Sequence, residues 1–305
     1  MVECRRSNMI EDPMPFESFI SAVLDLTFDT AAGIFADAKV EFGKNQMRTL
    51  GFFDGELYTN LAYLISDQCT TGIKLAAYSD EYKTEFLNRK EVCRSVLSQA
   101  QRSMEFLDAY NPLRSKIIGL RRIDYRAYPE ASLRESLVNA IVHRDYSLNS
   151  DILVSVYEDN MTISSYGGLR KGLGIEDIMM GISSPRNPRL AHIFYRLGFI
   201  ESYGTGIPRM MGEYRDALIK PTIETSTNVF KVKLPAMVHA AVDQQSVDAI
   251  MDLGRSRKSF TRPEAEKQTG ESRSKTGAIL SGMVEEGLLE RIGNGKSVRY
   301  RVRDI

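Results

Sequence analysis

The sequence predicts an α+β protein made of three consecutive units, residues 1–115, 116–236 and 237–305. Its 305 residues allow two or three domains, since a domain typically has roughly 100–200 residues. Helix-like and strand-like spacings of apolar residues occur in each unit. A hydrophobic content of 43% is sufficient to bury cores, which excludes disorder for most of the chain.

Several classes of protein are excluded by the same composition. No apolar run approaches the roughly 18 residues that a membrane-spanning helix needs. The first residues, Met-Val-Glu-Cys-Arg-Arg, are not followed by the apolar segment of a secretory signal. Cys4, Cys69 and Cys93 form no C-x-x-C pair, and the three histidines are scattered, so a disulfide scaffold or a zinc site is not expected. We therefore expect a reduced, cytoplasmic protein.

The first unit is predicted to be a small α+β module that ends in a connecting helix. Apolar spacing predicts helices over 16–26, 29–42 and 58–66, and the run GIKLAA over 72–77 predicts a buried strand. An amphipathic helix is predicted over 90–110, and Asn111-Pro112 ends it.

The second unit is predicted to mix strands with short helices. A strand is expected over 117–123 and a helix from Pro129 to about His143. The alternating segments 151–158 and 161–165 flank Asp159-Asn160, which is typical of a hairpin. Helices are expected from Asn187-Pro188 to 197 and from Gly206 to about 217, followed by strands over 221–226 and 228–234.

The third unit has the order of a winged helix-turn-helix. Helices are predicted over 243–253, 261–268 and 272–286, and strands over 288–292 and 297–302 flank Gly293-Asn294-Gly295. Residues 291–303 hold five basic residues and no acidic one. Duplex DNA is the expected partner, through Arg273, Lys275, Lys296, Arg299 and Arg301. The alternatives are a solvated strand face and a protein-binding or dimerisation module.

The most informative helix carries two stripes at a spacing of four residues. Leu133, Leu137 and Ile141 form an apolar stripe, whereas Glu135, Asn139 and His143 form a polar one. Asn and His are poor helix formers, so helix stability alone does not account for them. An amide oxygen is a suitable Mg²⁺ ligand, and a carboxylate can orient a water for attack on phosphorus. The alternative is a helix face that is merely polar.

Two glycine-containing loops follow this helix. Gly167-Gly168 comes directly after a predicted strand, and Gly204-Thr205-Gly206 opens a helix. Glycines at such positions let backbone N–H groups approach phosphate oxygens, and the helix dipole favours the anion. The segment Gly293-Asn-Gly-Lys-Ser297 is not a P-loop, because Glu290 occupies the place of the required first glycine and a strand follows. Helicase activity is therefore not supported by motif.

Residues 129–216 resemble the GHKL-type ATPase module of bacterial proteins labelled "RecG-like helicase C-terminal" or divergent AAA transcriptional regulators. The matching segments are LRESLVNAIVHRDYS (133–147), SYGGL (165–169), SSPRNPRLA (183–191) and GFIESYGTGIPRM (198–210). The segments YTNLAYLISDQ (58–68) and FLNRKEVCRSVLSQ (86–99) resemble the end of a Schlafen-type AlbA-like module, whose leading part is expected to be absent.

The resemblance implies a Bergerat-like α/β sandwich that binds ATP with Mg²⁺. Glu135 would be the water-orienting base and Asn139 the Mg²⁺ ligand, with His143 beside them. The nucleotide loops would contain Gly167, Gly168, Gly204, Thr205 and Gly206, with Arg186 and Asn187 in or beside the lid. The sequence departs from the family pattern at Ser165-Tyr166, where Asn-Pro is common, and at Pro208, where a third glycine is common.

These features together predict an ATP-binding, DNA-binding transcriptional regulator that forms a homodimer. One alternative is an active Mg²⁺-dependent ATPase that couples hydrolysis to a conformational change. The other is a nucleotide-free scaffold that binds DNA or protein as a dimer, and the departure at Ser165 favours the scaffold over the active ATPase.

Overall fold

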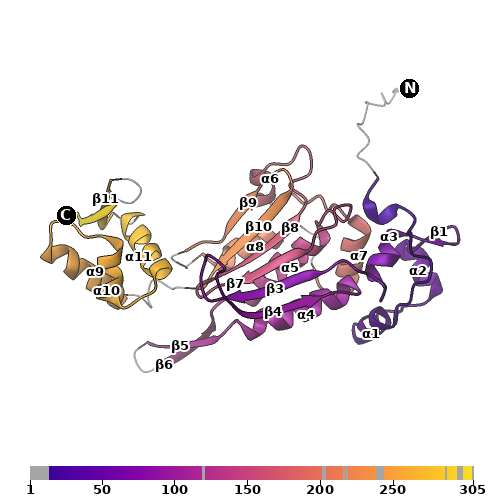
Figure 1. The fold of residues 1–305 in the computed structure, drawn as a ribbon, viewed down its shortest axis with the longest axis horizontal. Coiled ribbons are helices and arrows are strands. Elements are labelled where there is room, and N and C mark those ends of the chain that lie inside the picture. Colours follow the sequence, from indigo (N-terminus) through magenta and orange to yellow (C-terminus); the bar gives the residue numbers. More distant parts are fainter. Residues whose placement is uncertain are drawn as a thin grey trace.

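The computed structural model of the protein describes residues 14–118, 121–200, 204–215, 217, 219–237, 244–285, 287–293 and 298–303. It confirms a mixed α+β architecture. A six-stranded sheet with strand order β4-β3-β7-β8-β10-β9 lies at its centre (Figure 1). Its strands are β3 (Ile73–Tyr78), β4 (Phe86–Val92), β7 (Ile152–Val156), β8 (Asn160–Tyr166), β9 (Thr222–Thr225) and β10 (Val229–Pro235). β3 and β7 run parallel, and the other neighbouring pairs are antiparallel.

The central sheet takes strands from both sides of residue 115, the predicted boundary between the first two units. β3 and β4 come from the first predicted unit, whereas β7 to β10 come from the second. A single hydrophobic core accordingly extends from Leu26 to Met237. The parallel pairing of β3 with β7 joins segments about 80 residues apart, as in Ile73 opposite Ile152.

Helices pack on one face of this sheet (Figure 1). α4 (Val96–Ala109) contacts β3 and β4, and α5 (Glu130–Val142) contacts β8 and β10. α7 (Pro188–Arg196) and α8 (Gly206–Glu213) pack against α5 in turn. α5 is held by the predicted apolar stripe, since Leu133, Leu137 and Ile141 are all buried.

The N-terminal elements form a cap beside α7 and α4 (Figure 1). They are a 3-10 helix η1 (Phe16–Ser18), α1 (Asp29–Asp37), α2 (Lys44–Leu50), β1 (Phe53–Asp54), β2 (Leu57–Tyr58) and α3 (Asn60–Ile65). α3 begins after Thr59, whose hydroxyl oxygen accepts a hydrogen bond from the Ala62 amide. A two-stranded hairpin of β5 (Leu113–Ile118) and β6 (Arg121–Arg126) projects from the central body, away from these N-terminal elements (Figure 1).

Several predicted elements differ from the structure. The helix over 16–26 is wrong, because the backbone pairs with distant segments instead: Ser21 N donates to Tyr58 O, and Asn60 N donates to Phe19 O. The helix over 29–42 ends at Asp37. The helix over 90–110 begins only at Val96, because residues 86–92 pair with β3 as an edge strand. The strand over 117–123 is the hairpin β5–β6, and the helices α2 and α6 (Ile175–Met179) were not predicted.

The C-terminal unit follows its predicted order of elements. α9 (Gln244–Ser256), α10 (Arg262–Thr269) and α11 (Arg273–Glu285) precede the antiparallel pair β11 (Leu289–Ile292) and β12 (Arg299–Val302). These elements bury a core of their own, centred on Ile250, Phe260 and Leu280. The Glu264 carboxylate accepts hydrogen bonds from the amide and hydroxyl of Thr261, which closes the capping box of α10. Among the residues that the structure describes, no helix is long and apolar enough to cross a membrane.

Candidate functional site

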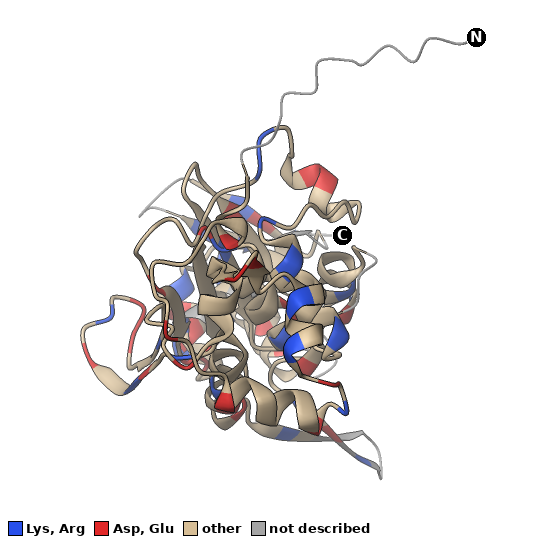
Figure 2. Cartoon of the chain, turned by 90° about the vertical axis from the view of Figure 1, so that its right-hand side faces the viewer, with Lys and Arg blue, Asp and Glu red and all other residues tan. Residues whose placement is uncertain are grey.

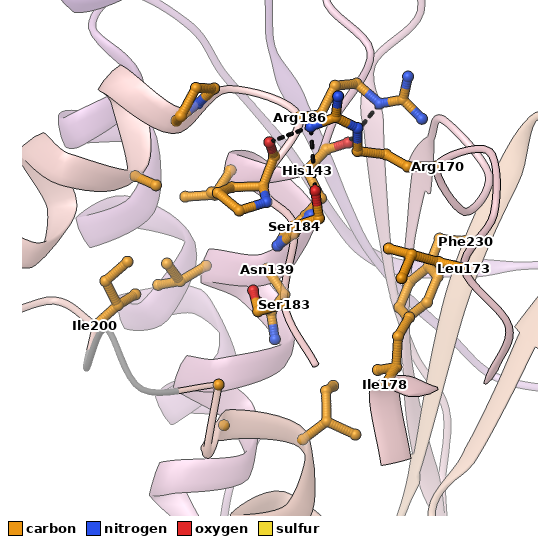
Figure 3. A pocket seen from close by; sticks show the side chains of 18 of the residues that line it. Asn139, His143, Arg170, Leu173, Ile178, Ser183, Ser184, Arg186, Ile200 and Phe230 are labelled. Atoms are coloured by element: carbon orange, nitrogen blue, oxygen red, sulfur yellow. Dashed lines mark hydrogen bonds between the residues drawn. The ribbon is translucent and has the colours of Figure 1, made fainter. Parts of the chain in front are cut away.

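A pocket of about 420 Å³ lies between α5, the loop after β8, the segment leading to α7, and the start of α8 (Figure 3). Its size is in the range of small-molecule sites. Eight of the predicted site residues line it: Glu135, Asn139, His143, Gly167, Gly168, Arg186, Gly204 and Gly206. The fold therefore brings together four predicted segments that lie up to about 70 residues apart in the sequence.

The polar stripe of α5 faces this pocket. Asn139 Nδ2 donates a hydrogen bond of 2.8 Å to Glu135 Oε1. This bond uses the amide nitrogen of Asn139, and the amide oxygen is the atom of that side chain with the chemistry of a Mg²⁺ ligand. Both side chains are partly buried, because the opposite face of α5 packs into the core.

The glycines of the two loops allow close approach between parts of the protein itself. A Cβ at Gly206 would overlap with the Glu135 carboxylate, which places that carboxylate at the N-terminal residue of α8. A Cβ at Gly204 would overlap with the Gly181 carbonyl, and one at Gly168 with the carbonyls of residues 226 and 227. A negative group at the N-terminus of a helix is electrostatically favourable. Gly206 is thus the glycine that packs against Glu135, whereas Gly204 and Gly168 pack against other backbone segments.

Two arginines hold the segment 182–186 over the pocket. Arg186 donates hydrogen bonds to the carbonyls of His143 (3.3 Å) and Gly168 (3.0 Å), and its Nη1 lies 3.6 Å from Asp145 Oδ2. Arg170 donates to the hydroxyl of Ser184 and the carbonyl of Pro185. These bonds connect the loop after β8, the end of α5 and the entry to α7, as Figure 3 shows.

Two predicted residues do not line the pocket. The amide of Asn187 is buried and donates to the carbonyls of Val142 (2.9 Å) and Arg144 (2.8 Å), so it braces the start of α7 against the end of α5. Thr205 is exposed at the N-terminal boundary of α8. Ser165, where the family pattern differs, is buried in β8 and also does not line the pocket.

An apolar side of the pocket was not anticipated from the sequence. Leu173, Ile178, Ile182 and Phe230 line it, and Leu173, Ile178 and Phe230 lie together, away from the two arginines (Figure 3). Phe230 belongs to β10, which the sequence predicted only as a strand over 228–234. No sequence signal distinguishes a pocket-lining Phe from a core Phe, since both obey the same period.

His143 is neutral at physiological pH. Burial, and then the charges of Arg186 and Arg170, lower its pKa to about 4. A neutral imidazole leaves one ring nitrogen able to accept a hydrogen bond and the other able to donate one.

We expect His143 to make the protein less stable as the pH falls. Between about 6.5, the pKa of an unfolded histidine, and the folded value of about 4, the unfolded chain binds the proton and the folded chain does not. The free energy of unfolding should therefore fall by up to about 3 kcal/mol over this interval. Urea unfolding of wild type and His143→Gln at pH 7 and pH 4.5 measures the difference. The same replacement at the exposed His192 is the matched control, and identical pH curves for wild type and His143→Gln would contradict the prediction.

The residues present are compatible with a nucleotide and Mg²⁺. Within the described ranges no group of three His, Cys, Asp or Glu side chains forms a metal site. Mg²⁺ commonly takes only one or two protein ligands and completes its shell with phosphate oxygens and water. Asn139 supplies such an oxygen, while the arginines and the apolar side suit an anionic group and a planar ring respectively.

Several predicted DNA-binding residues of the C-terminal unit form ion pairs with glutamates, which neutralise part of their positive charge. Arg301 Nη2 lies 2.8 Å from Glu290 Oε2 across the β11–β12 pair, and Arg299 Nη2 lies 4.0 Å from Glu264 Oε2. Residues 291–303 contain no acidic residue, yet these arginines have acidic neighbours, because strand pairing brings Glu290 opposite Arg301. Lys275 pairs with Glu271, and Arg273 is exposed at the first residue of α11. Lys296 lies outside the described residues.

Acidic and basic residues are also interspersed elsewhere on the surface. Figure 2, which views the molecule from the side of the N-terminal elements, shows Lys and Arg alongside Asp and Glu. This agrees with the equal totals of 40 basic and 40 acidic residues.

Comparison with known proteins supports an ATPase-type module. Residues 149–234 match the family described as "Putative ATP-dependent DNA helicase recG C-terminal". The match covers β7 to β10 and the loops around the pocket, and it begins after Glu135 and Asn139. No curated protein matches the chain.

The fold is similar to that of the DIP2311 protein from Corynebacterium diphtheriae, a solved structure. The TM-score is 0.64 at 18% sequence identity, and the alignment covers 96% of this chain and 65% of that one. At this identity the similarity concerns the fold alone. The chain thus corresponds to about two thirds of the length of that protein.

Proposed function

We propose that the pocket binds ATP together with Mg²⁺, and that the protein is a nucleotide-responsive, DNA-binding regulator of transcription. The observation that carries the nucleotide part is the hydrogen-bonded pair Glu135–Asn139, which faces a pocket lined by the ATPase-type module. Its supports are the apolar side of the pocket, the two arginines and the nearby N-terminus of α8.

Each side chain has a distinct proposed role. Asn139 offers its amide oxygen to Mg²⁺, which would neutralise charge between phosphate oxygens. Glu135 orients a water and accepts its proton, as a carboxylate hydrogen-bonded to a neighbouring amide can do. Arg170 and Arg186 bring positive charge to the pocket, and Leu173, Ile178 and Phe230 exclude water from a bound ring.

We expect ATP with Mg²⁺ to raise the melting temperature of the full chain. Ligand at about 100 times its Kd stabilises the folded state by roughly 2.7 kcal/mol. Asn139→Ala should remove most of the Mg²⁺-dependent part of this shift, whereas Asn45→Ala, at an exposed position of α2, should leave it unchanged. Differential scanning fluorimetry with ATP, with and without Mg²⁺, is the measurement.

Glu135→Gln distinguishes an active ATPase from a protein that only binds ATP. The amide preserves the size of the side chain but cannot accept the proton of the attacking water, so binding persists and any hydrolysis stops. Wild type that binds ATP without turnover would remove the active-ATPase alternative. Absence of any thermal shift at millimolar nucleotide would contradict the proposal of nucleotide binding. The nucleotide-free scaffold would then be the remaining alternative.

We propose in addition that the C-terminal unit is a winged helix that binds duplex DNA. Three helices followed by an antiparallel pair, with Arg273 exposed at the start of α11, support this. A homodimer belongs to the proposal, because two such units would contact two half-sites, and sedimentation velocity of the full chain tests it.

The salt dependence of DNA binding should show whether Arg299 and Arg301, the arginines of β12, contact phosphates. Each phosphate contact contributes about 0.9 to the slope of log affinity against log salt, so Arg299→Ala with Arg301→Ala should flatten the slope by at most about two units. Since Glu290 neutralises Arg301, Glu290→Gln should strengthen binding. Fluorescence anisotropy of the full chain at several salt concentrations measures both. An unchanged slope in the double variant would exclude the β11–β12 pair as the DNA-contacting element.

A further inference from the structure

A second cavity, of about 400 Å³, lies at the opposite end of the central sheet. The first pocket adjoins the end of β8 at Gly167, whereas this cavity adjoins the carboxyl ends of the parallel strands β3 and β7, at Tyr78 and Val156. Because β7 and β8 are antiparallel, these two ends of the sheet are separated by the length of the strands. Carboxyl ends of parallel strands are frequent sites of ligand binding.

Tyrosine is the most frequent residue type in the lining of this cavity. Four tyrosines contribute, Tyr78, Tyr110, Tyr128 and Tyr157. The rings of Tyr78 and Tyr157 are stacked, with centroids 5.6 Å apart and an angle of 20° between their planes. Buried Ala77 and Val156 also contribute to the lining. A flat ring is the shape that such a set of surfaces accommodates.

The wall of the cavity is fixed by buried hydrogen bonds. Asn111, which is 1% exposed, donates from its amide to Tyr128 O (2.9 Å) and accepts from Tyr128 N (2.8 Å). Ala127 N donates to Pro112 O, which attaches the base of the β5–β6 hairpin to the same segment. The cavity is thus formed by a braced junction and not by a mobile loop.

Arg114 is a positively charged residue of this lining, and the Lys83 ammonium lies 5.3 Å from the centroid of the Tyr78 ring. Arg114 is partly buried and, within the described part of the chain, makes no ion pair. Burial and the charge of Asp159 raise the pKa of Tyr128, whereas Arg114 acts to lower it. The Tyr128 phenol therefore remains protonated close to Arg114, and both side chains can donate to an anion. Glu158 is exposed at the rim, where it disfavours a ligand with a second negative group.

We propose that this cavity binds a small aromatic monoanion, such as an aromatic carboxylate. The ring lies among the tyrosines, and the carboxylate accepts hydrogen bonds from Arg114 and the Tyr128 hydroxyl. The site is independent of the nucleotide pocket in its residues and in its place on the sheet.

The position of the site suits an effector of the C-terminal unit. The chain leaves the sheet through two backbone hydrogen bonds, from Ala236 N to Asp159 O and from Met237 N to Ala127 O. Ala127 also lines the cavity. A ligand there would contact the segment that anchors the last residues before the C-terminal unit.

The test uses the full chain with 2-naphthoate as the probe. Isothermal titration calorimetry measures the affinity and the stoichiometry, and the variants below assign the binding to this cavity. We expect saturable binding of one naphthoate per chain. 2-Naphthalenemethanol, which lacks the charge, and cyclohexanecarboxylate, which lacks the aromatic ring, should each bind at least about tenfold more weakly.

The matched variants lie on the same hairpin. Arg114→Gln should weaken naphthoate binding by about tenfold or more, because a charge-assisted hydrogen bond is lost. Arg122→Gln is the control, since Arg122 is exposed, pairs with Asp124 and does not line the cavity. Tyr157→Leu, which removes a stacked ring and keeps an apolar side chain, should also weaken naphthoate binding. The proposal is overturned if wild type shows no saturable binding up to about 5 mM probe, or if folded Arg114→Gln binds as wild type does.

Discussion

Gly204→Ala should abolish nucleotide binding and lower the free energy of unfolding by about 2–4 kcal/mol. Gly204 has a φ of +68°, where an L side chain is strained, and its added Cβ would overlap with the backbone carbonyl of Gly181. A backbone atom cannot move away as the end of a flexible side chain can. The substitution should therefore separate the start of α8 from the segment that follows α6, and so open the pocket between them.

Two other glycines separate the cost of the positive φ from the cost of the contact with Gly181. Gly198 has a similar φ of +73° with open space around the added Cβ, so Gly198→Ala measures the cost of the backbone conformation alone, about 1 kcal/mol. Gly212 lies within α8 with no atom near the added Cβ, and Gly212→Ala should stabilise by about 0.4–1 kcal/mol. Urea unfolding and the ATP-dependent thermal shift provide both readouts. Equal losses for Gly204→Ala and Gly198→Ala would show that the contact with Gly181 is unimportant.

Glu17→Ala should cost about 3–5 kcal/mol of unfolding free energy, because two charge-assisted hydrogen bonds are lost at once. The Glu17 carboxylate is fully buried and accepts hydrogen bonds from the amides of Arg189 (2.7 Å) and Leu190 (2.9 Å). It thereby caps the N-terminus of α7 from a segment more than 170 residues away. Burial raises the pKa of Glu17, and the two amide hydrogen bonds act in the opposite direction.

Loss of this cap should also weaken ligand binding, since α7 lines the pocket with Ala191, His192 and Tyr195. Denaturant unfolding measures the stability, and the ATP thermal shift of the folded variant measures binding. Glu81→Ala, at an exposed position between β3 and β4, is the control for removing a carboxylate. A loss below about 1 kcal/mol, the range of an exposed interaction, would show that water replaces the carboxylate at the α7 amides.

The candidate site was predictable where its chemistry is local. Glu135, Asn139 and His143 share a helix face because they are spaced by four residues, and the apolar stripe of Leu133, Leu137 and Ile141 determines which face is buried. The hairpin at Asp159-Asn160 and the order of helices and strands in the C-terminal unit were predictable for the same reason, since turn residues and periodicity act over a few residues.

Other residues took their roles from partners that no local pattern identifies. Asn187 belongs to the matching segment 183–191, yet its amide donates hydrogen bonds to the carbonyls of Val142 and Arg144 and does not face the pocket. Arg301 lies in a stretch without acidic residues, yet Glu290 is its cross-strand neighbour. Phe230 lines the pocket because of the register of β10 against β8, where it lies opposite Ser165.

The sequence by itself determined the α+β class, the core-facing side of α5, the position of the glycine loops and the element order of the C-terminal unit. Only the tertiary structure decided that residues 86–92 form an edge strand, that the segment 16–26 is helical only over residues 16–18, and that one sheet extends across residue 115. It also decided that Glu17 caps α7. Periodicity and capping arise from neighbours along the chain, whereas strand pairing, charge neutralisation and burial depend on segments brought together by long-range packing, whose free energy overrides weak local preference.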